Sequence, residues 1–438
     1  MIEMKRFSAL KMLIAIVTLL AGCTGSGSSA PPPTNVNAVA GDSSVTISWD
    51  MLPGVEYWIF SAAANSVTPQ SCGSLPACQT KLNAVSPAVV AGTAGIVTPG
   101  FTTNGTVVGL TNGTTYSFTV NGRKGGGPGG PGSPSVSAIP RLAGNTWSVG
   151  TPLGVNDLHG VTYGTTAVAG VTGNAFVAVG ANGALFSSPD GKIWTALVNP
   201  VPSVNLNTAV SYGSNYLAAG TGGVMLLSSD ANAKTWKQQT TGTTNDLYAL
   251  ASNGAGGYVA VGAKGTIITS NGGAGWAVVN SGTLNNLYGV TYANSKYVAV
   301  GAAGTLLTSF DGTTWTSVVP QTLADLKGVA YGGASTTNGV TSGVNTFVAI
   351  GAAGTLVTSL DGGVTWALHT PISTLNLNAV TYGHQFVAVG DNGGIFTSTD
   401  GLVWQAQTPV TSATLYAVTH GLYDYSSAGG TGLNLYAM

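Results

Sequence analysis

One segment dominates the sequence, because related copies of it recur from Leu158 to the C-terminus. Its clearest copy, residues 287–315, reads LYGVTYANSKYVAVGAAGTLLTSFDGTTW. Each copy contains an apolar stretch ending in an aromatic residue, two further apolar stretches, and then Asp-Gly and a stretch that begins with Trp. Short apolar stretches between turn residues predict β-strands, so each copy is expected to form one small four-stranded sheet.

The second stretch of each copy is apolar on both faces, which favours a strand packed between neighbouring sheets. Its Ala and Gly residues allow those sheets to approach closely. It recurs at 176–180, 216–220, 258–262, 297–301, 347–351 and 386–390. Repeated four-stranded sheets of this kind are typical of a β-propeller.

The strand count predicts an all-β propeller with seven blades over residues 142–438. Stretches that begin with Trp start at Trp147, Trp194, Trp236, Trp276, Trp315, Trp366 and Trp404. First strands are expected at 158–163, 208–212, 247–252, 287–292, 326–331, 377–382 and 415–420. Because one Trp strand precedes the first full copy, N-terminal and C-terminal strands should share a composite blade, which leaves no free inner edge. We expect this blade to be incomplete, with only 415–420, 433–438 and the Trp147 strand.

The turn before each Trp resembles the Asp-box, or BNR, repeat of sialidase-like propellers. The copy that starts at Ser359 fits the form S-x-D-x-G-x-T-W at every fixed position, and those that start at Ser187, Ser309 and Ser398 keep Asp-Gly. The copies at 228–236 and 270–276 are degraded, and the latter has Asn271 and no Asp. We expect the Asp to accept backbone N–H bonds, the Gly to adopt a left-handed conformation and the Trp to pack over the turn. In that superfamily the boxes lie on the face opposite the catalytic one.

The resemblance does not bring sialidase chemistry with it. Sialidases need an arginine cluster and a Tyr/Glu pair, whereas the repeat region has no Glu and no Arg beyond Arg141. Related glycoside hydrolases hold two carboxylates across the scissile bond, which here could only be Asp; this activity is the alternative. A closer resemblance is to the seven-bladed photosystem assembly factor (Ycf48-like) group and other BNR-like proteins, which act by binding. The role in photosynthesis is not carried over.

The N-terminus resembles a bacterial lipoprotein signal. Residues 1–22 have a basic opening and an apolar core too short to span a bilayer. The sequence LAGC that ends at Cys23 resembles the lipobox, which implies lipid attachment at Cys23 and a cell-envelope location; a plain secretory signal with an incidental Cys is the alternative. Thr24 rather than Asp follows, which favours the outer membrane, and 23–33 is expected to be a tether.

The two other cysteines, Cys72 and Cys78, are close in sequence, and the predicted signal places them outside the cytoplasm. A disulfide is expected between them. A metal site is the alternative, although two thiolates do not complete a tetrahedral shell. The four histidines share no ligand spacing, so neither a metal nor a cofactor is expected.

Residues 34–141 form a separate domain by composition. Strand-like stretches alternate with Asn-Gly and Pro-Gly turns. Trp49 in the second stretch, with Leu110 and Tyr116 six residues apart, resembles a fibronectin type III domain. In that family the Tyr forms a corner, with its hydroxyl bonded back to the chain. The resemblance therefore implies a sandwich ahead of the propeller.

Composition limits the partners. Charged residues are 6% of the chain and the formal net charge is −1. A nucleic-acid partner needs a basic stripe, which isolated lysines do not provide. Neutral hydroxyl and amide groups must keep the surface hydrated.

Candidate ligand-binding residues precede the first strand of five copies. They are expected at equivalent positions near a central channel and are Asp157, Asp246, Asn286, Asp325 and Asn376. As Asx residues they can cap the turn into the strand, or they can form a ring of oxygens for a cation or a polyol. We predict a glycan or partner-protein site here, because short polar loops around a channel mouth suit a concave site. Replacing Asp157, Asp246 and Asp325 with Ala is expected to abolish binding without unfolding the chain. The sequence thus favours a membrane-anchored, non-enzymatic binding scaffold.

Overall fold

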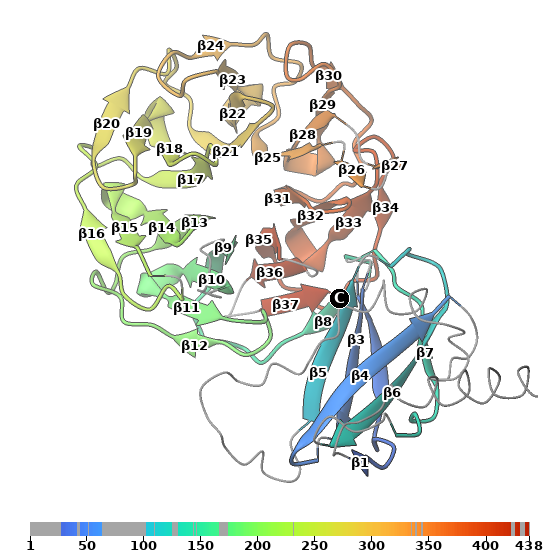
Figure 1. Ribbon diagram of the computed structural model, residues 1–438. Helices are drawn as coiled ribbons and strands as arrows, with labels where there is room; N and C mark the ends of the chain where they lie inside the picture. Colours follow the sequence, from blue (N-terminus) through green and yellow to red (C-terminus); the bar gives the residue numbers. More distant parts are fainter. Residues whose placement is uncertain are drawn as a thin grey trace, which may run out of the picture. The chain divides into compact units, whose positions relative to one another are not determined.

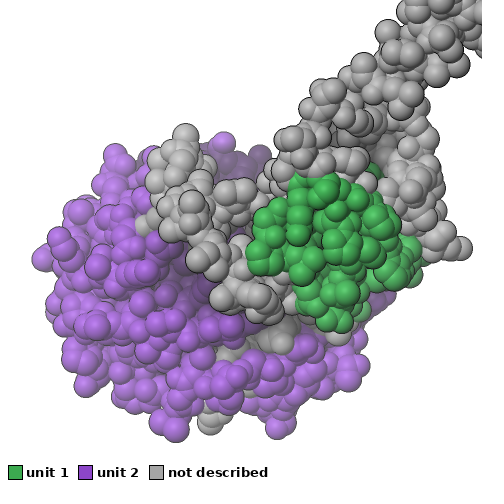
Figure 2. Space-filling model, turned by 60° about the horizontal axis from the view of Figure 1, so that its bottom comes forward, with its two compact units in different colours: residues 1–142 green, residues 143–438 purple. Residues whose placement is uncertain are grey.

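The computed structural model describes residues 28–437 except 42–43, 51, 64–101, 109, 125–129, 143, 146, 166–173, 231, 334, 338–339, 343–344, 422–424 and 430–433. The chain divides into two compact units, which meet in sequence at Leu142 and Ala143 (Figure 2). The predicted signal 1–22, the lipid site Cys23 and the pair Cys72 and Cys78 lie outside the described residues. In the part that is described, the regular elements are β-strands and single 3-10 turns, and no helix has the length and hydropathy of a membrane span.

Unit 1 consists of two antiparallel sheets that share one core (Figure 1). The first has the order β2 (Asn37–Gly41), β3 (Ser44–Asp50), β5 (Thr102–Val108). The second has the order β1 (Ser28–Ser29), β6 (Tyr116–Lys124), β4 (Val55–Ala62), with β7 (Val136–Ala138) also paired to β6. Trp49 of the first sheet and Tyr57 and Phe118 of the second are almost fully buried in the shared core.

A tyrosine ties the start of β6 to the preceding chain. The backbone N–H of Thr111 donates a hydrogen bond of 3.1 Å to Oη of Tyr116. Leu110 and Tyr116 are both buried in the core of unit 1. This is the bond that the predicted tyrosine corner requires.

The predicted tether 23–33 is wrong at its C-terminal end. Ser28 and Ser29 pair with Lys124 and Arg123 of β6. Ala30 is buried, and its N–H donates to the carbonyl oxygen of Gly122. Small residues that lack apolar periodicity can still pair at the edge of a sheet, because that pairing uses only the backbone.

The described residues of unit 2 form seven four-stranded antiparallel sheets. The first strands are β9 (Leu158–Thr165), β13 (Leu206–Tyr212), β17 (Leu247–Ser252), β21 (Leu287–Ala293), β25 (Leu326–Gly332), β31 (Leu377–Tyr382) and β35 (Leu415–His420). The second strands are β10 (Asn174–Gly180), β14 (Asn215–Gly220), β18 (Gly257–Gly262), β22 (Lys296–Gly301), β28 (Thr346–Gly351), β32 (Phe386–Gly390) and β36 (Tyr425–Gly429). The third strands are β11 (Leu185–Ser188), β15 (Met225–Ser228), β19 (Ile267–Asn271), β23 (Leu306–Ser309), β29 (Leu356–Ser359), β33 (Ile395–Ser398) and β37 (Asn434–Ala437). The fourth strands are β12 (Thr195–Ala196), β16 (Lys237–Gln239), β20 (Trp276–Val279), β24 (Thr316–Ser317), β30 (Ala367–Leu368), β34 (Gln405–Ala406) and β8 (Trp147–Val149).

The seven sheets form a closed ring with the first strands innermost (Figure 1). Each first strand contacts the first strand of the next sheet, and β35 contacts β9. A hydrophobic cluster lies between each pair of neighbouring sheets, so the core of unit 2 is divided into seven parts. The hairpin of β26 (Ser335–Thr337) and β27 (Val340–Ser342) is inserted between β25 and β28.

The last sheet corrects one prediction. The N-terminal strand β8 pairs with β37, with Val149 opposite Leu435, so the sheet is composite as expected. It is not incomplete, because β36 supplies the strand that was thought to be missing. The sequence of β36, Tyr-Ser-Ser-Ala-Gly, lacks the Val-rich pattern of the other second strands, and its pairing therefore escaped prediction.

Candidate functional site

Among the residues that the structure describes, six single-turn 3-10 segments lie at one end of the ring, between the second and third strands of successive sheets. They are η1 (Ala181–Gly183), η2 (Thr221–Gly223), η3 (Ala263–Gly265), η4 (Ala302–Gly304), η5 (Ala352–Gly354) and η6 (Asp391–Gly393). The middle residue of each has a positive φ, between 51° and 66°. The first strands begin at this same end, since Leu247 pairs with Gly262 at the end of β18. We call this end of the ring the turn face.

Side chains before the first strands accept hydrogen bonds from the turns of the preceding sheets. In each case the Oδ1 atom accepts the N–H of the middle residue of a 3-10 turn. The pairs are Asn205 with Asn182 at 2.9 Å, Asp246 with Gly222 at 2.8 Å, Asn286 with Lys264 at 2.9 Å, Asp325 with Ala303 at 3.0 Å and Asn376 with Ala353 at 3.0 Å. Four of the five predicted site residues therefore connect one sheet to the next.

The backbone carbonyls of the same residues bind the turn of their own sheet. The carbonyl oxygen of Asp246 accepts the N–H of Ala263 at 2.9 Å, and that of Asp157 accepts the N–H of Ala181 at 2.8 Å. A Cβ atom on Gly262 would lie 1.9 Å from the carbonyl oxygen of Asp246, so this approach needs glycine. The sequence analysis offered capping of the turn into the strand as one role for these Asx residues. In the structure the side chain does cap a turn, but that turn belongs to the neighbouring sheet.

Asn205 is a residue of this series that the sequence analysis missed. The first strand was expected to begin at residue 208, whereas β13 begins at Leu206. An Asn-Leu pair at 205–206 matches Asp246-Leu247, and this was the available signal.

A second set of side chains comes from the residue that follows the first Leu of each first strand. We call this set the inner ring. All of these side chains are partly exposed, and they come from the innermost strands of seven different sheets (Figure 1). They are His159, Asn207, Tyr248, Tyr288, Lys327, Asn378 and Tyr416. The sequence analysis did not single them out, because the residue type at this position varies between the copies.

Members of the inner ring contact one another across sheet boundaries. The rings of Tyr248 and Tyr288 are 5.8 Å apart between centroids, and the Lys327 Nζ atom lies 3.6 Å from the Tyr288 ring centroid. The rings of His159 and Tyr416 pack edge to face at 5.5 Å. Asn378 donates to the carbonyl oxygen of Leu415 at 3.0 Å. Such contacts hold the side chains in place before any ligand arrives.

Carboxylates of the turn face lie close to the inner ring. The Lys327 Nζ atom lies 3.5 Å from Asp325 Oδ2. Burial raises the pKa of the Tyr416 hydroxyl, and the negative charges of Asp157 and Asp391 raise it further. Burial lowers the pKa of His159 although Asp157 opposes this effect, so a neutral imidazole predominates at neutral pH. The inner ring therefore combines tyrosine rings, amides, one ammonium group and nearby carboxylates.

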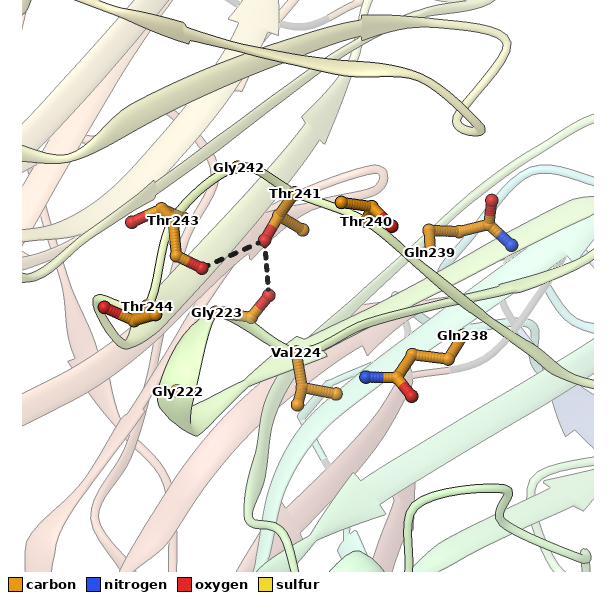
Figure 3. A pocket seen from close by; sticks show the side chains of 10 residues that line it. All are labelled: Gly222, Gly223, Val224, Gln238, Gln239, Thr240, Thr241, Gly242, Thr243 and Thr244. Carbon is orange, nitrogen blue, oxygen red and sulfur yellow. Dashed lines mark hydrogen bonds between the residues drawn. The ribbon is translucent and has the colours of Figure 1, made fainter.

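A depression of about 640 Å³ adjoins the turn face beside η2 (Figure 3). Its lining residues are neutral: they come from η2, from β16 and from the loop Thr240 to Thr244. Thr241 Oγ1 donates to the carbonyl oxygen of Gly223 at 2.8 Å and lies 3.2 Å from that of Thr243. The depression extends the turn face with uncharged donors and acceptors.

The opposite end of the ring, the hairpin face, carries the Ser-x-Asp-Gly turns. In one of them, Asp311 Oδ1 accepts the N–H groups of Thr313 at 2.8 Å and Thr314 at 2.7 Å. Gly312 has a φ of 75° and donates to Ser309 Oγ, and Trp315 Nε1 donates to the carbonyl oxygen of Gly312 at 3.0 Å. The turn has the geometry that its residues predict.

The carboxyl groups of these turns have lowered pKa values. Hydrogen bonds from turn amides and hydroxyls hold the pKa of Asp311 and Asp361 well below the usual range. Burial acts to raise the pKa of Asp190, Asp230 and Asp400, but hydrogen bonds of the same kind outweigh it and the pKa of each is lowered. Across the residues that the structure describes, no group of three or more His, Cys, Asp or Glu side chains could hold a metal ion.

Comparison with known proteins identifies the fold. No family model matches the chain, and no curated protein matches it. The solved structure of YCF48 bound to D1 peptide is 18% identical, with a TM-score of 0.53 over 67% of this chain and 94% of that one. YCF48 from Cyanidioschyzon merolae is 17% identical, with a TM-score of 0.51 over 66% of this chain and 98% of that one. The RRP9 WD40 repeats are 7% identical, with a TM-score of 0.52 over 68% of this chain and 98% of that one. At these identities the likeness shows the fold alone, and that fold is a β-propeller.

Proposed function

We propose that this chain is a non-enzymatic binding scaffold of the cell envelope, and that the inner ring and the turn face around it recognise a partner protein or a glycan. The inner ring carries the proposal, because it brings partly exposed side chains from seven sheets to one place. Tyrosine rings, amides and charged groups that are already in contact with each other suit a specific, preformed site. YCF48, a propeller of similar fold, is described in complex with a D1 peptide, which fits a peptide segment as ligand.

The finer identity of the two units belongs to the same proposal. We regard unit 2 as a seven-bladed propeller of the Asp-box type, supported by its seven sheets and its Ser-x-Asp-Gly turns. Unit 1 is proposed to be a fibronectin type III-like domain, supported by its two sheets and the Thr111 to Tyr116 bond. Lipid on Cys23 would hold both units at the membrane, with the outer membrane favoured, and a Cys72–Cys78 disulfide would close a small loop.

The glycoside hydrolase alternative receives less support from the carboxyl groups. A hydrolase needs an acid whose pKa is raised and a second carboxylate across the scissile bond. The Asp residues of the hairpin face have lowered pKa values because they accept several hydrogen bonds. They are suited to stabilising turns.

Full-length protein with Tyr288→Ala and Tyr416→Ala tests the proposal. Both substitutions remove partly exposed rings of the inner ring and leave the Asx hydrogen bonds intact, so the fold should persist. We expect glycan-array signals or cross-links to a defined envelope protein to fall by about tenfold or more, since one lost anchor is worth about 1.4 kcal/mol. Tyr212→Ala, at an exposed residue elsewhere on unit 2, is the control and should bind normally.

Two results would contradict the proposal. Equal binding by the double variant and the wild type would exclude the inner ring. Release of new reducing ends from a polysaccharide panel would instead establish the hydrolase. The set Asp157, Asp246 and Asp325 is a poorer test than the sequence suggested, because the Asp246 and Asp325 side chains also join sheets.

A further inference from the structure

The turn at 270–276 keeps the frame of its neighbours without the Asp. Gly273 donates to Ser270 Oγ at 3.0 Å, and Trp276 Nε1 donates to the carbonyl oxygen of Gly273 at 3.0 Å. The next turn has the same two bonds, from Gly312 to Ser309 and from Trp315 to Gly312. The backbone path is therefore held by Ser, Gly and Trp even where the carboxylate is absent.

Small residues replace the side chains that cover the other turns. Gly272, Ala274 and Gly275 stand where the next copy has Asp311, Thr313 and Thr314. In two further copies, Ile193 and Val403 occupy the position of Gly275, with exposed fractions of 73% and 69%. The turn at 270–276 thus lacks an outer layer of side chains.

A depression of about 500 Å³ lies at this uncovered turn. One wall comes from the sheet of β17 to β20 and includes Asn253, Asn271 and Trp276, and the other comes from the next sheet and includes Asp311 and Thr313. The indole N–H of Trp276 is bonded to Gly273, and the half-buried ring lines the depression. Exposed Asn271, Asp311 and Thr313 contribute hydrogen-bonding groups around it.

The chemistry of this lining selects a class of ligand. None of the residues that line the depression is cationic, and the charged group among them is the Asp311 carboxylate, which would repel an anionic ligand. Asp311 Oδ2 accepts a bond from Thr314 Oγ1 at 3.2 Å, and because the carboxylate is exposed, a ligand hydroxyl can compete with the Thr313 hydroxyl for it. A pyranose ring complements the groups of the depression. Its apolar C–H face can pack on the indole ring, and its hydroxyl groups can bond to the carboxylate and the amides.

We propose that this depression binds a neutral pyranose unit of a glycan, stacked on Trp276 and hydrogen-bonded to Asp311 and Asn271. The site lies on the hairpin face, whereas the inner ring belongs to the turn face. It is therefore independent of the binding function proposed above.

Saturation-transfer NMR on the full chain tests the site, with methyl β-glucoside, methyl β-galactoside, methyl α-mannoside and N-acetylglucosamine as probes. Gly275→Val restores a side chain that other copies have, and a Cβ atom at Gly275 meets nothing within 4 Å, so this variant should fold. We expect ring-proton signals for at least one sugar with the wild type. Gly275→Val should raise the dissociation constant obtained from these signals by about tenfold, equivalent to about 1.4 kcal/mol, and Asn271→Ala should raise it less.

The matched control is Ile193→Val, which puts the same residue at the corresponding position of another turn and should bind like the wild type. Absence of signal for all four sugars, or equal signals from Gly275→Val and the control, would overturn the proposal. Signals for N-acetylarginine amide and none for the sugars would also overturn it, since they would indicate a cationic ligand at the Trp and Asp. Variants of the inner ring should leave these sugar signals unchanged.

Discussion

A single Asx residue in unit 2 accepts two hydrogen bonds through two different atoms. The side chain of Asp246 binds the turn of the preceding sheet, and its carbonyl oxygen binds the turn of its own sheet. Asn serves as well as Asp here, as Asn286 and Asn376 show, because only an acceptor is required. The repeated choice between Asn and Asp is thus explained by hydrogen bonding across the ring.

The Asp residues of the hairpin face behave differently, because their charge matters. The hydroxyl and the amide of Thr365 donate to Asp361, and together with other turn donors they lower its pKa. A carboxyl whose pKa is lower in the folded chain than in the unfolded chain stabilises the fold above the unfolded pKa. That stabilisation is lost as the pH falls toward the folded value.

We therefore expect the urea midpoint of the wild type to fall between neutral pH and about pH 3. Asp361→Asn should lower the midpoint at neutral pH and make it less dependent on acid, since the amide has no charge to lose. Unfolding followed by tryptophan fluorescence at several pH values measures both effects. An unchanged pH dependence in the variant would show that Asp361 contributes no such stabilisation.

Residue types were easier to predict than their partners. The Ser, Asp, Gly and Trp residues of the hairpin turns act within one short segment, so their bonds follow from sequence spacing. The Asx residues bond to turns about 22 to 24 residues away, in another sheet, and no local pattern reports such a contact. The inner ring was missed because its members share a position and not a residue type.

At the scale of the element, the turn between the second and third strands packs closely against the backbone segments that lead into the first strands. Gly262 ends β18 against the carbonyl oxygen of Asp246, and Gly265 lies against that of Thr283. The Gly that closes each second strand in the sequence repeat is explained by this contact. The backbone of Gly262 is extended, with φ −168°, so glycine is required here for lack of space and not for its conformational freedom.

Gly262→Ala should therefore destabilise unit 2, because a Cβ atom would lie 1.9 Å from a carbonyl oxygen. The expected loss is about 1–3 kcal/mol, the usual range for overpacking. Gly275→Ala is the control, since its Cβ atom has open space. Urea unfolding should separate the two variants, and equal midpoints would show that the turn can move aside.

Most strands followed from apolar periodicity, and the exceptions have a physical cause. β36 is polar, and β1 consists of two serines. Both are held by backbone pairing with neighbouring strands, which side-chain patterns do not report. Sequence therefore predicts buried strands best and poorly patterned strands worst.

At the scale of the whole molecule, the chain combines a low charge with a proposed lipid anchor. Charged residues are 6% of the sequence, so attraction between charges is a weak means of holding it at a membrane. Several acyl chains would bind firmly, since each buried methylene contributes about 0.8 kcal/mol.

Cys23→Ser tests that anchor. We expect an unlipidated precursor that stays in the aqueous phase of a detergent partition, whereas the wild type enters the detergent phase. Cys72→Ser is the control, because it leaves the predicted lipobox intact. Detergent partition of Cys23→Ser equal to that of the wild type would reject the anchor.

The pairing of β8 with β37 has a consequence for how the ring is made. The strand at 147–149 meets its partner at 435–437, so nearly the whole propeller must be synthesised before its first strand has a neighbour. Closing so long a loop costs little more than closing a short one, because the entropy grows only with the logarithm of the length. It is slow, however, and until it happens both β8 and the growing sheet edge are open to pairing with other chains. A protein that crosses a membrane from its N-terminus would thus face its greatest risk of aggregation just before its last residues arrive.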